Sequence, residues 1–139
     1  MSLEVYVLLK RSQLPTLAAW QGALDGLGFG ITLDATFSPH IDTGFVPCKF
    51  NGSSTGFEFS LGTKTDLVKT YPDLGPRTEL FDTSAAFLWG GDLNECVSAI
   101  CSAAALTKLS AGLMYDPQED QLFSGSEAVL EGQKLVGKA

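Results

Sequence analysis

The chain has 139 residues, 45% of them hydrophobic, and a formal net charge of −7 from 16 acidic and 9 basic residues. This is a normal length for one domain and is enough to bury a core without disulfides or metal ions, so we expect a single globular domain over residues 1–139. No basic cluster exceeds the pair Lys10-Arg11. The chain therefore lacks the positive charge that nucleic-acid binding requires, and an acidic surface favours basic partners, although net acidity also simply aids solubility.

Three cysteines, Cys48, Cys96 and Cys101, are an odd number and contain no C-x-x-C spacing. This argues against a disulfide framework and against a zinc site, and indicates reduced thiols that act as small hydrophobic side chains. We expect no bound metal ion and no organic cofactor.

The apolar run over residues 5–9 is too short for a secretory leader, and its basic residues follow it rather than precede it. The charge-free stretches are too short to cross a membrane or contain Gly and Pro. We therefore expect a cytoplasmic protein that does not bind membranes.

The chain opens with a predicted strand and a predicted helix. Residues 4–10 alternate around β-branched and aromatic side chains, which is typical of a strand. Residues 12–27 carry apolar side chains at spacings of three and four, with Pro15 in the first turn, and Gly28 is a suitable residue to end a helix.

The next predicted elements are strands. Alternation over residues 31–37 predicts a second strand, and residues 45–50 and 56–61 alternate in the same way. The sequence Asn51-Gly52 opens the short polar link between them and is a strong hairpin signal. Pro47 indicates that the first arm of this hairpin lies at a sheet edge or carries a bulge.

The middle of the chain is less regular. Residues 62–77 are interpreted as the longest irregular connection, in which a short helix over 63–71 is the alternative to a loop. Residues 78–89 predict another strand. Asp92 then caps an alanine-rich helix, with Glu95 at the third position of a capping box.

Two short strands and a helix complete the chain. Residues 113–115 and 121–123 predict a hairpin around an acidic turn, and Ser126 is predicted to cap a last helix that ends near residue 136. Because hairpins dominate this order of elements, we expect an α+β fold: a mainly antiparallel sheet of five to six strands with two or three helices packed on one face.

The sequence offers few groups for catalysis. His40 is the only histidine, and Asp42, two residues away, is the nearest carboxylate that could orient it. We interpret His40 as a loop residue, and the aromatic residues, including Trp20, Trp89 and most phenylalanines, as core. No catalytic residue is proposed from the sequence.

Five acidic residues are the candidates for contact with a partner, because exposed carboxylates on loops and strand faces attract basic surfaces. Three of them form an acidic turn that lacks the pattern of a calcium-binding loop. The set is Asp42, Glu58, Asp116, Glu119 and Asp120.

Two patterns carry a resemblance to a known class of proteins. They are Gly44-Phe45-Val46-Pro47 followed by Gly56-Phe57-Glu58, and Phe87-Leu88-Trp89-Gly90-Gly91-Asp92 with Glu95, an alanine-rich helix and Gly112-Leu113-Met114-Tyr115-Asp116-Pro117. They cover about a third of the chain and resemble small bacterial immunity proteins, which are encoded beside secreted toxins, as well as uncharacterised bacterial domains of this size. The resemblance implies a non-enzymatic protein that binds and neutralises a cognate toxin.

Two alternatives remain open. The first is a small-molecule-binding or enzymatic domain that uses His40 and nearby carboxylates. The second is a structural domain that forms homo-oligomers through the strand edge near Pro47 or through the alanine-rich helix.

Overall fold

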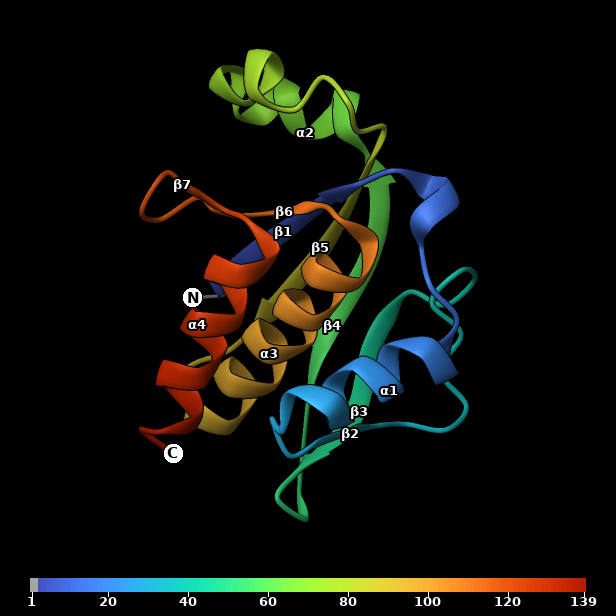
Figure 1. Ribbon diagram of the computed structural model, residues 1–139, viewed down its shortest axis with the longest axis vertical. Coiled ribbons are helices and arrows are strands. Elements are labelled where there is room, and N and C mark those ends of the chain that lie inside the picture. Colours follow the sequence, from blue (N-terminus) through green and yellow to red (C-terminus); the bar gives the residue numbers. More distant parts are fainter. Residues whose placement is uncertain (1–2) are drawn as a thin grey trace.

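The computed structural model describes residues 3–139 (Figure 1). Within this range, seven strands form one sheet in the order β2-β3-β4-β5-β1-β6-β7, and every neighbouring pair is antiparallel. The strands are β1 (Leu3–Leu9), β2 (Ile31–Leu33), β3 (Gly44–Phe50), β4 (Ser53–Thr63), β5 (Thr83–Trp89), β6 (Leu113–Asp116) and β7 (Gln121–Phe123). The predicted α+β class with a mainly antiparallel sheet is confirmed. The predicted count of five to six strands is too low, because the short strands also pair at the two edges.

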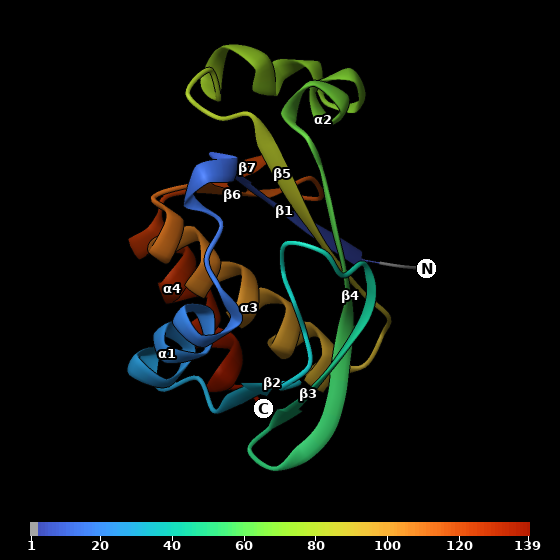
Figure 2. The ribbon, with the colours of Figure 1, turned by 90° about the vertical axis from the view of Figure 1, so that its right-hand side faces the viewer.

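The described residues also form four α-helices: α1 (Leu17–Leu27), α2 (Lys64–Thr70), α3 (Leu93–Ser110) and α4 (Gly125–Val136). Figures 1 and 2 show α1, α3 and α4 on one face of the sheet, with α3 between the other two, and α2 at one end of the sheet. Three helices on one face agree with the prediction, and α2 is additional. Two short 3-10 helices, η1 (Arg11–Gln13) and η2 (Pro72–Arg77), complete the elements.

Helix α3 lies close to the sheet because its surface is built from small residues. Every residue from Val97 to Thr107 is buried. On one side, Trp20 of α1 donates from Nε1 to the carbonyl oxygen of Ser102 at 3.0 Å. On the other, a Cβ on Gly132 of α4 would come within 3.4 Å of the Cys101 sulfur, so these helices are in close contact. This burial removes the alanine-rich helix as a surface for self-association.

An aromatic cluster joins the helices to the sheet. The ring of Trp20 lies 5.8 Å from Phe37, 5.7 Å from Phe59 and 5.9 Å from Phe87, measured between ring centroids. Trp20 is fully buried and Trp89 is 8% exposed, so both tryptophans are core residues as predicted. The alternation of residues in β4 and β5 therefore gives one apolar face to the helices.

The predicted hairpin is present, with a tighter turn than the polar link suggested. Phe50 pairs with Ser53, so Asn51 and Gly52 alone form the turn, both with positive φ angles (48° and 85°). This is the conformation that favours Asn-Gly in two-residue hairpins. The prediction from Pro47 that this arm lies at a sheet edge or carries a bulge is wrong for the strand as a whole, since β3 lies between β2 and β4 in a regular register. Pro47 itself lies just past the three residues of β3 that pair with β2.

Strand β2 is shorter than predicted because Asp34 begins a turn. The Asp34 carboxylate accepts hydrogen bonds from the backbone N–H and the hydroxyl of Thr36, and its carbonyl oxygen accepts from the Phe37 N–H. The chain therefore bends after Leu33, although the alternating pattern continues to Phe37. The Phe37 ring still packs in the core, against Trp20.

Residues 62–77 are not an irregular connection, since they contain α2 and η2, and the short helix that was the alternative to a loop over 63–71 is present as α2. Thr63 caps α2 by accepting from the Asp66 N–H at 3.1 Å. The following strand also starts later than predicted, at Thr83. Before it, the Thr78 hydroxyl donates to the Leu74 carbonyl oxygen, and the Phe81 N–H donates to the Thr78 carbonyl oxygen. Residues 78–81 are therefore a turn.

Helix α4 is capped by Ser124, two residues before the predicted cap. The Ser124 hydroxyl accepts from the Glu127 N–H at 3.3 Å, and the Glu127 carboxylate accepts from the Ser124 N–H at 2.9 Å. These two bonds form a capping box, and the second lowers the pKa of Glu127.

We expect Ser124→Ala to lower the free energy of unfolding by about 1 kcal/mol, since it removes an N-cap acceptor. Ser126→Ala is the matched control: Ser126 is exposed inside the first turn of α4 and makes no comparable bond, so its effect should be close to zero. Urea denaturation of both variants measures the difference. Equal losses would show that the capping box contributes nothing.

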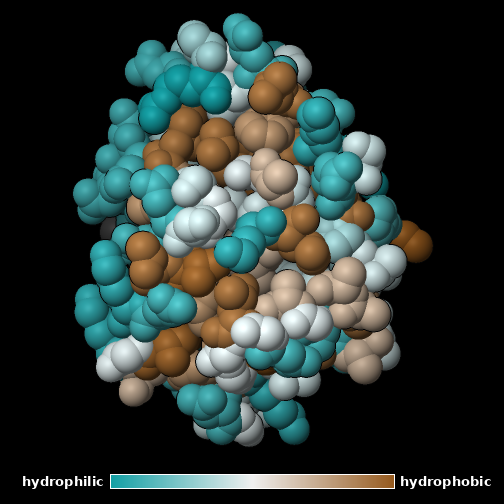
Figure 3. All heavy atoms as spheres, viewed as in Figure 1, coloured by the Kyte–Doolittle hydropathy of each residue, from teal (hydrophilic) through white to brown (hydrophobic). Residues whose placement is uncertain are grey.

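The helix-bearing face is chemically mixed. Figure 3 shows apolar residues in the middle of this view, with hydrophilic residues around the rim. None of the helices in residues 3–139 combines the length and apolar character needed to cross a membrane.

Candidate functional site on the open face of the sheet

The second face of the sheet is only partly covered. In Figure 2, α1, α3 and α4 lie on one side of β4 and β5, and among the described residues no helix covers the other side of these strands below α2. Near β1 and β6, the segment α2–η2 packs on this side through Leu67 and Leu74, which contact Leu8 and Tyr115. The remaining surface, over β3, β4 and β5, is exposed.

The strand register places four side chains in one row across this open face. Phe45 pairs with Glu58, Glu58 with Leu88, and Leu88 with Glu4. Directly paired residues of antiparallel strands project to the same face, and neighbouring strands lie about 4.8 Å apart. The row therefore presents an aromatic ring, a carboxylate, an apolar side chain and a second carboxylate, with the two carboxylate-bearing strands about 10 Å apart.

A depression of about 240 Å³ lies at the Phe45 end of this row. Phe45 is 62% exposed, and its ring lies over Gly56, where an added Cβ would clash with the ring. Glu58 and Leu88 continue the lining, and Glu95 forms the far wall. The two patterns on which the resemblance rests, far apart in the sequence, thus meet at one surface depression.

Glu95 is held in place by the start of α3. Its Oε1 accepts a hydrogen bond from the Gly90 N–H at 3.0 Å, while its own N–H donates to the Asp92 carboxylate at 3.2 Å. The prediction that Asp92 caps α3 is confirmed. The reciprocal bond differs from a standard capping box, because the Glu95 carboxylate reaches Gly90 rather than Asp92. The charge is consequently fixed beside the depression.

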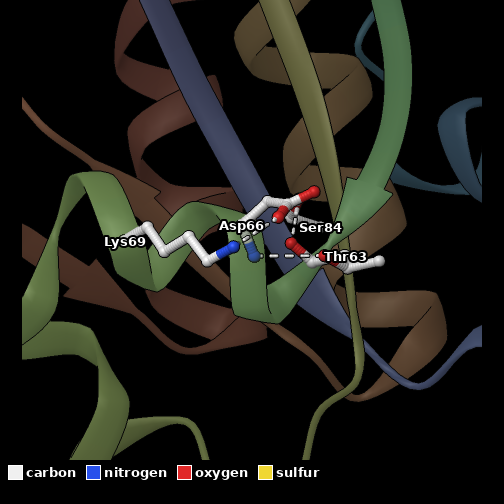
Figure 4. A network of polar contacts seen from close by, with 4 residues as sticks. All are labelled: Thr63, Asp66, Lys69 and Ser84. Atoms are coloured by element: carbon white, nitrogen blue, oxygen red, sulfur yellow. Dashed lines mark hydrogen bonds and ion pairs between the residues drawn. The ribbon is translucent and has the colours of Figure 1, made fainter.

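A second depression, of about 370 Å³, adjoins the first at Leu88. Its floor is made of small residues of β4 and β5 (Ser60, Gly62, Ser84 and Ala86), with Glu4 and Tyr6 on one side and α2 on the other. Figure 4 shows the polar contacts where β4 leads into α2: the Thr63 hydroxyl accepts from the Asp66 N–H, and the Asp66 carboxylate pairs with Lys69 of the same helix at 3.7 Å. The Ser84 hydroxyl of β5 donates to the Thr63 carbonyl oxygen at 3.5 Å.

We call the two adjoining depressions the open-face groove, defined by Glu4, Tyr6, Phe45, Gly56, Glu58, Ser60, Gly62, Asp66, Ser84, Ala86, Leu88 and Glu95. All four charged residues in its lining are acidic. Among the described residues, Asp66 alone of these four forms an ion pair, with Lys69. The groove is therefore a negatively charged surface that also presents the exposed Phe45 ring and the half-exposed Leu88.

Three tyrosines rigidify the Glu4 side of the groove. Tyr71 packs on Tyr6 and Tyr115, with ring centroids 6.1 and 5.4 Å apart, and its hydroxyl donates to the Glu4 carboxylate at 3.1 Å. Burial, reinforced by Glu4, raises the pKa of Tyr6 and Tyr71. Burial and the hydrogen bond to Asp120 raise the pKa of Tyr115 to about 12.

This cluster predicts a loss of stability at alkaline pH. Above pH 10, the usual tyrosine pKa, the unfolded chain releases protons that the folded chain retains, so the free energy of unfolding should fall from pH 10 towards pH 12. The chain has only three tyrosines, all in this cluster, so tyrosinate absorbance reports on it alone. We expect little tyrosinate at pH 10 in the folded protein. A native titration midpoint near 10 would contradict the packing described.

The predicted contact residues are distributed over three places. Glu58 is exposed in the open-face groove. Asp42 is exposed in the loop before β3, where its carboxylate accepts from the Ser38 N–H at 2.8 Å. The other three lie at the β6–β7 turn, at the edge of the sheet farthest from β2 and β3 in the strand order.

The acidic turn is internally bonded. Asp116 accepts from the Gln118 N–H, and Asp120 accepts from the Tyr115 hydroxyl, both at 2.9 Å, while Glu119 is exposed. The Asp116 carboxylate therefore stabilises the turn, and the Asp120 carboxylate holds the Tyr115 hydroxyl of the tyrosine cluster. Only Glu58 of the predicted set belongs to the groove.

His40 is exposed in the loop between β2 and β3, and its carbonyl oxygen accepts from the Arg11 guanidinium at 3.3 Å. Asp42 is bonded to Ser38 and not to the imidazole. Within residues 3–139, no group of three or more His, Cys, Asp and Glu side chains lies close enough to hold a metal ion. All three cysteines are free, and burial raises the pKa of each thiol.

The sequence analysis selected only Glu58 among the groove residues, and three of those that it missed are informative. Phe45 was interpreted as a core residue and is exposed; its pairing with Glu58, opposite the helix-facing Phe57 and Phe59, was the signal that identifies its face. Glu4 is the one charged residue inside the apolar run of β1, and Leu88 lies between two buried residues of β5. These residues lie side by side only because of the order of the strands in the sheet, and that order cannot be read from the hydrophobic pattern of each strand.

Comparison of the chain with protein-family models and with curated proteins finds no match.

Proposed function

We propose that this protein is a non-enzymatic binding protein of the immunity type. It neutralises a cognate bacterial toxin by binding the toxin at the open-face groove. The observation that supports this most is the open sheet face itself, where the exposed Phe45 ring and the half-exposed Leu88 have only acidic charged neighbours: Glu4, Glu58, Asp66 and Glu95. The two sequence patterns that resemble immunity proteins supply both sides of one of its depressions.

Physical arguments favour a basic protein as the partner. A net charge of −7 steers a positively charged surface towards the protein and raises the association rate, and matched charges then fix the orientation of the complex. The face is preorganised, since Glu95 and Glu4 are held by hydrogen bonds and Gly56 supports the Phe45 ring. Rigid surfaces lose less conformational entropy on binding.

The test uses the product of the gene adjacent to this one, purified as its toxic domain. We expect a stable complex, protection of cells that express both proteins, and an inhibition curve that reaches its end point at a fixed stoichiometry. A catalytic antidote would inhibit at far lower molar ratios. The proposal is overturned if the two proteins form no complex, or if no toxin is encoded beside the gene.

A further inference from the structure

The open-face groove has a shape and charge pattern that suit one kind of side chain. This argument rests on the proposed function and names the chemistry of the partner at that site. Phe45 and Glu58 are direct cross-strand neighbours, so a flat aromatic ring and a carboxylate stand side by side on an exposed face. A guanidinium group can stack on such a ring and donate two parallel hydrogen bonds to such a carboxylate. An ammonium group is also attracted to both, but it cannot stack as a plane on the ring or donate two parallel hydrogen bonds to the carboxylate.

Leu88 continues the row between the two glutamates. The methylene stem of an arginine, or an apolar residue next to it, can cover Leu88 and remove its half-exposed surface from water. Beyond Leu88, Glu4 presents its carboxylate with one oxygen held by Tyr71, so a second positive charge on the same segment can pair there.

The floor of the groove leaves room for neighbouring side chains of the bound segment. Along β4 and β5, the open-face residues on one side of the row are Ser60, Gly62, Ser84 and Ala86, none larger than serine. Helix α2 bounds this space, and its Asp66 adds negative charge at the rim. The space is therefore a negatively charged cavity of about 370 Å³ beside the row.

We infer that the open-face groove binds an arginine-bearing loop or extended segment of the toxin, with one guanidinium stacked on Phe45 and paired with Glu58, and with the adjoining apolar side chain on Leu88. Occupancy by a basic segment satisfies the carboxylates of the row, which make no ion pair within the described residues. A second copy of this chain is a poor occupant, because its net charge of −7 repels the acidic groove.

The first experiment needs no toxin. A blocked pentapeptide of sequence Gly-Leu-Arg-Leu-Gly is titrated into the ¹⁵N-labelled full chain at low salt, alongside the same peptide with lysine or with the neutral isostere citrulline. We expect amide shifts at groove positions of β4, β5 and β1, and an apparent affinity about fivefold lower for lysine, because it loses the stacking and bidentate terms. Citrulline should produce no saturable shift. Shifts spread over all acidic surfaces, or equal for the three peptides, overturn the inference.

Variants then localise the contact. Glu58→Gln removes the charge at the row, and we expect it to weaken binding of the arginine peptide about tenfold, the equivalent of one lost charge-assisted bond. Glu119→Gln is the matched control, since Glu119 is an exposed carboxylate in the β6–β7 turn, and it should change the affinity less than about twofold. Circular dichroism verifies that both variants are folded. Equal effects of the two substitutions overturn the inference.

The same pair of variants in the toxin-binding assay separates the two proposals. If the toxin binds the wild-type protein and Glu58→Gln has no effect, the groove inference fails while the proposed function stands. If the toxin does not bind at all, the proposed function fails and the peptide titration alone decides the groove.

Discussion

Replacing Trp20 with alanine is expected to remove about 3–5 kcal/mol of folding free energy, a large part of the 5–15 kcal/mol typical of a domain. The indole is fully buried where α1 meets the sheet, and it contacts the rings of Phe37, Phe59 and Phe87. Its Nε1 also donates to the Ser102 carbonyl oxygen of α3. The substitution leaves a cavity and removes the additional hydrogen bond that the Ser102 carbonyl oxygen accepts from α1. The midpoint and slope of urea unfolding measure the loss.

A pair of milder substitutions distinguishes packing from hydrogen bonding. Trp20→Phe keeps an aromatic ring in the cluster but removes the donor to Ser102, whereas Trp89→Phe removes an indole whose Nε1 makes no hydrogen bond in the described part of the chain. We expect Trp20→Phe to be the more destabilising by about 1 kcal/mol, the usual net value of one hydrogen bond. Equal losses at the two positions would mean that the bond to α3 contributes nothing to stability.

The position of Trp20 could be predicted because it belongs to a helical pattern that the structure follows. Leu24 shares its buried face, and Gly28 ends the helix in a left-handed conformation, as its place after the apolar stripe indicated. The hairpin at Asn51-Gly52 was predictable for the same reason: the turn requires positive φ at both residues, and few other dipeptides accept it. Such signals are local, and local signals are what a single sequence contains.

The errors have a different origin, because they depend on hydrogen bonds and tertiary contacts that the local pattern of hydrophobicity does not record. The alternation after Leu33 continues to Phe37, but the Asp34 side chain bends the backbone there. Ser126 and Ser124 are equally good capping residues by type, but only Ser124 is followed three residues later by a glutamate, Glu127, and this capping-box spacing was overlooked. Residues 64–70 form a helix that is held against the sheet by Leu67, a tertiary contact invisible in the segment itself.

The candidate site was predictable only in part. Alternation in β4 correctly places Glu58 on the face opposite Phe57 and Phe59. It does not indicate that Glu4 of β1 lies in the same row, since β1 and β4 are separated by β5 in the sheet and by some fifty residues in the chain. The acidic turn at 116–120 attracted attention because its charges are adjacent in sequence, yet two of its carboxylates are used inside the fold.

The second large effect is expected at Phe45 and concerns binding rather than folding. Aromatic side chains at the centre of an interface contribute far more than their neighbours, so we expect Phe45→Ala to weaken binding of the proposed toxin partner by about 2 kcal/mol or more, which is roughly a thirtyfold rise in Kd. The stability of the free protein should fall by less than about 1 kcal/mol, because the ring is 62% exposed and its folded-state contacts are those of one cross-strand pair over Gly56.

The matched control is Leu80→Ala. Leu80 is a large apolar side chain that is 75% exposed, in the turn before β5 and outside the groove, so its removal deletes exposed apolar surface without touching the proposed interface. Isothermal calorimetry on the wild type and the two variants gives the comparison. If Leu80→Ala weakens the complex as much as Phe45→Ala does, the toxin contacts another surface, because the effect would then follow exposed apolar area in general and not the ring beside Glu58.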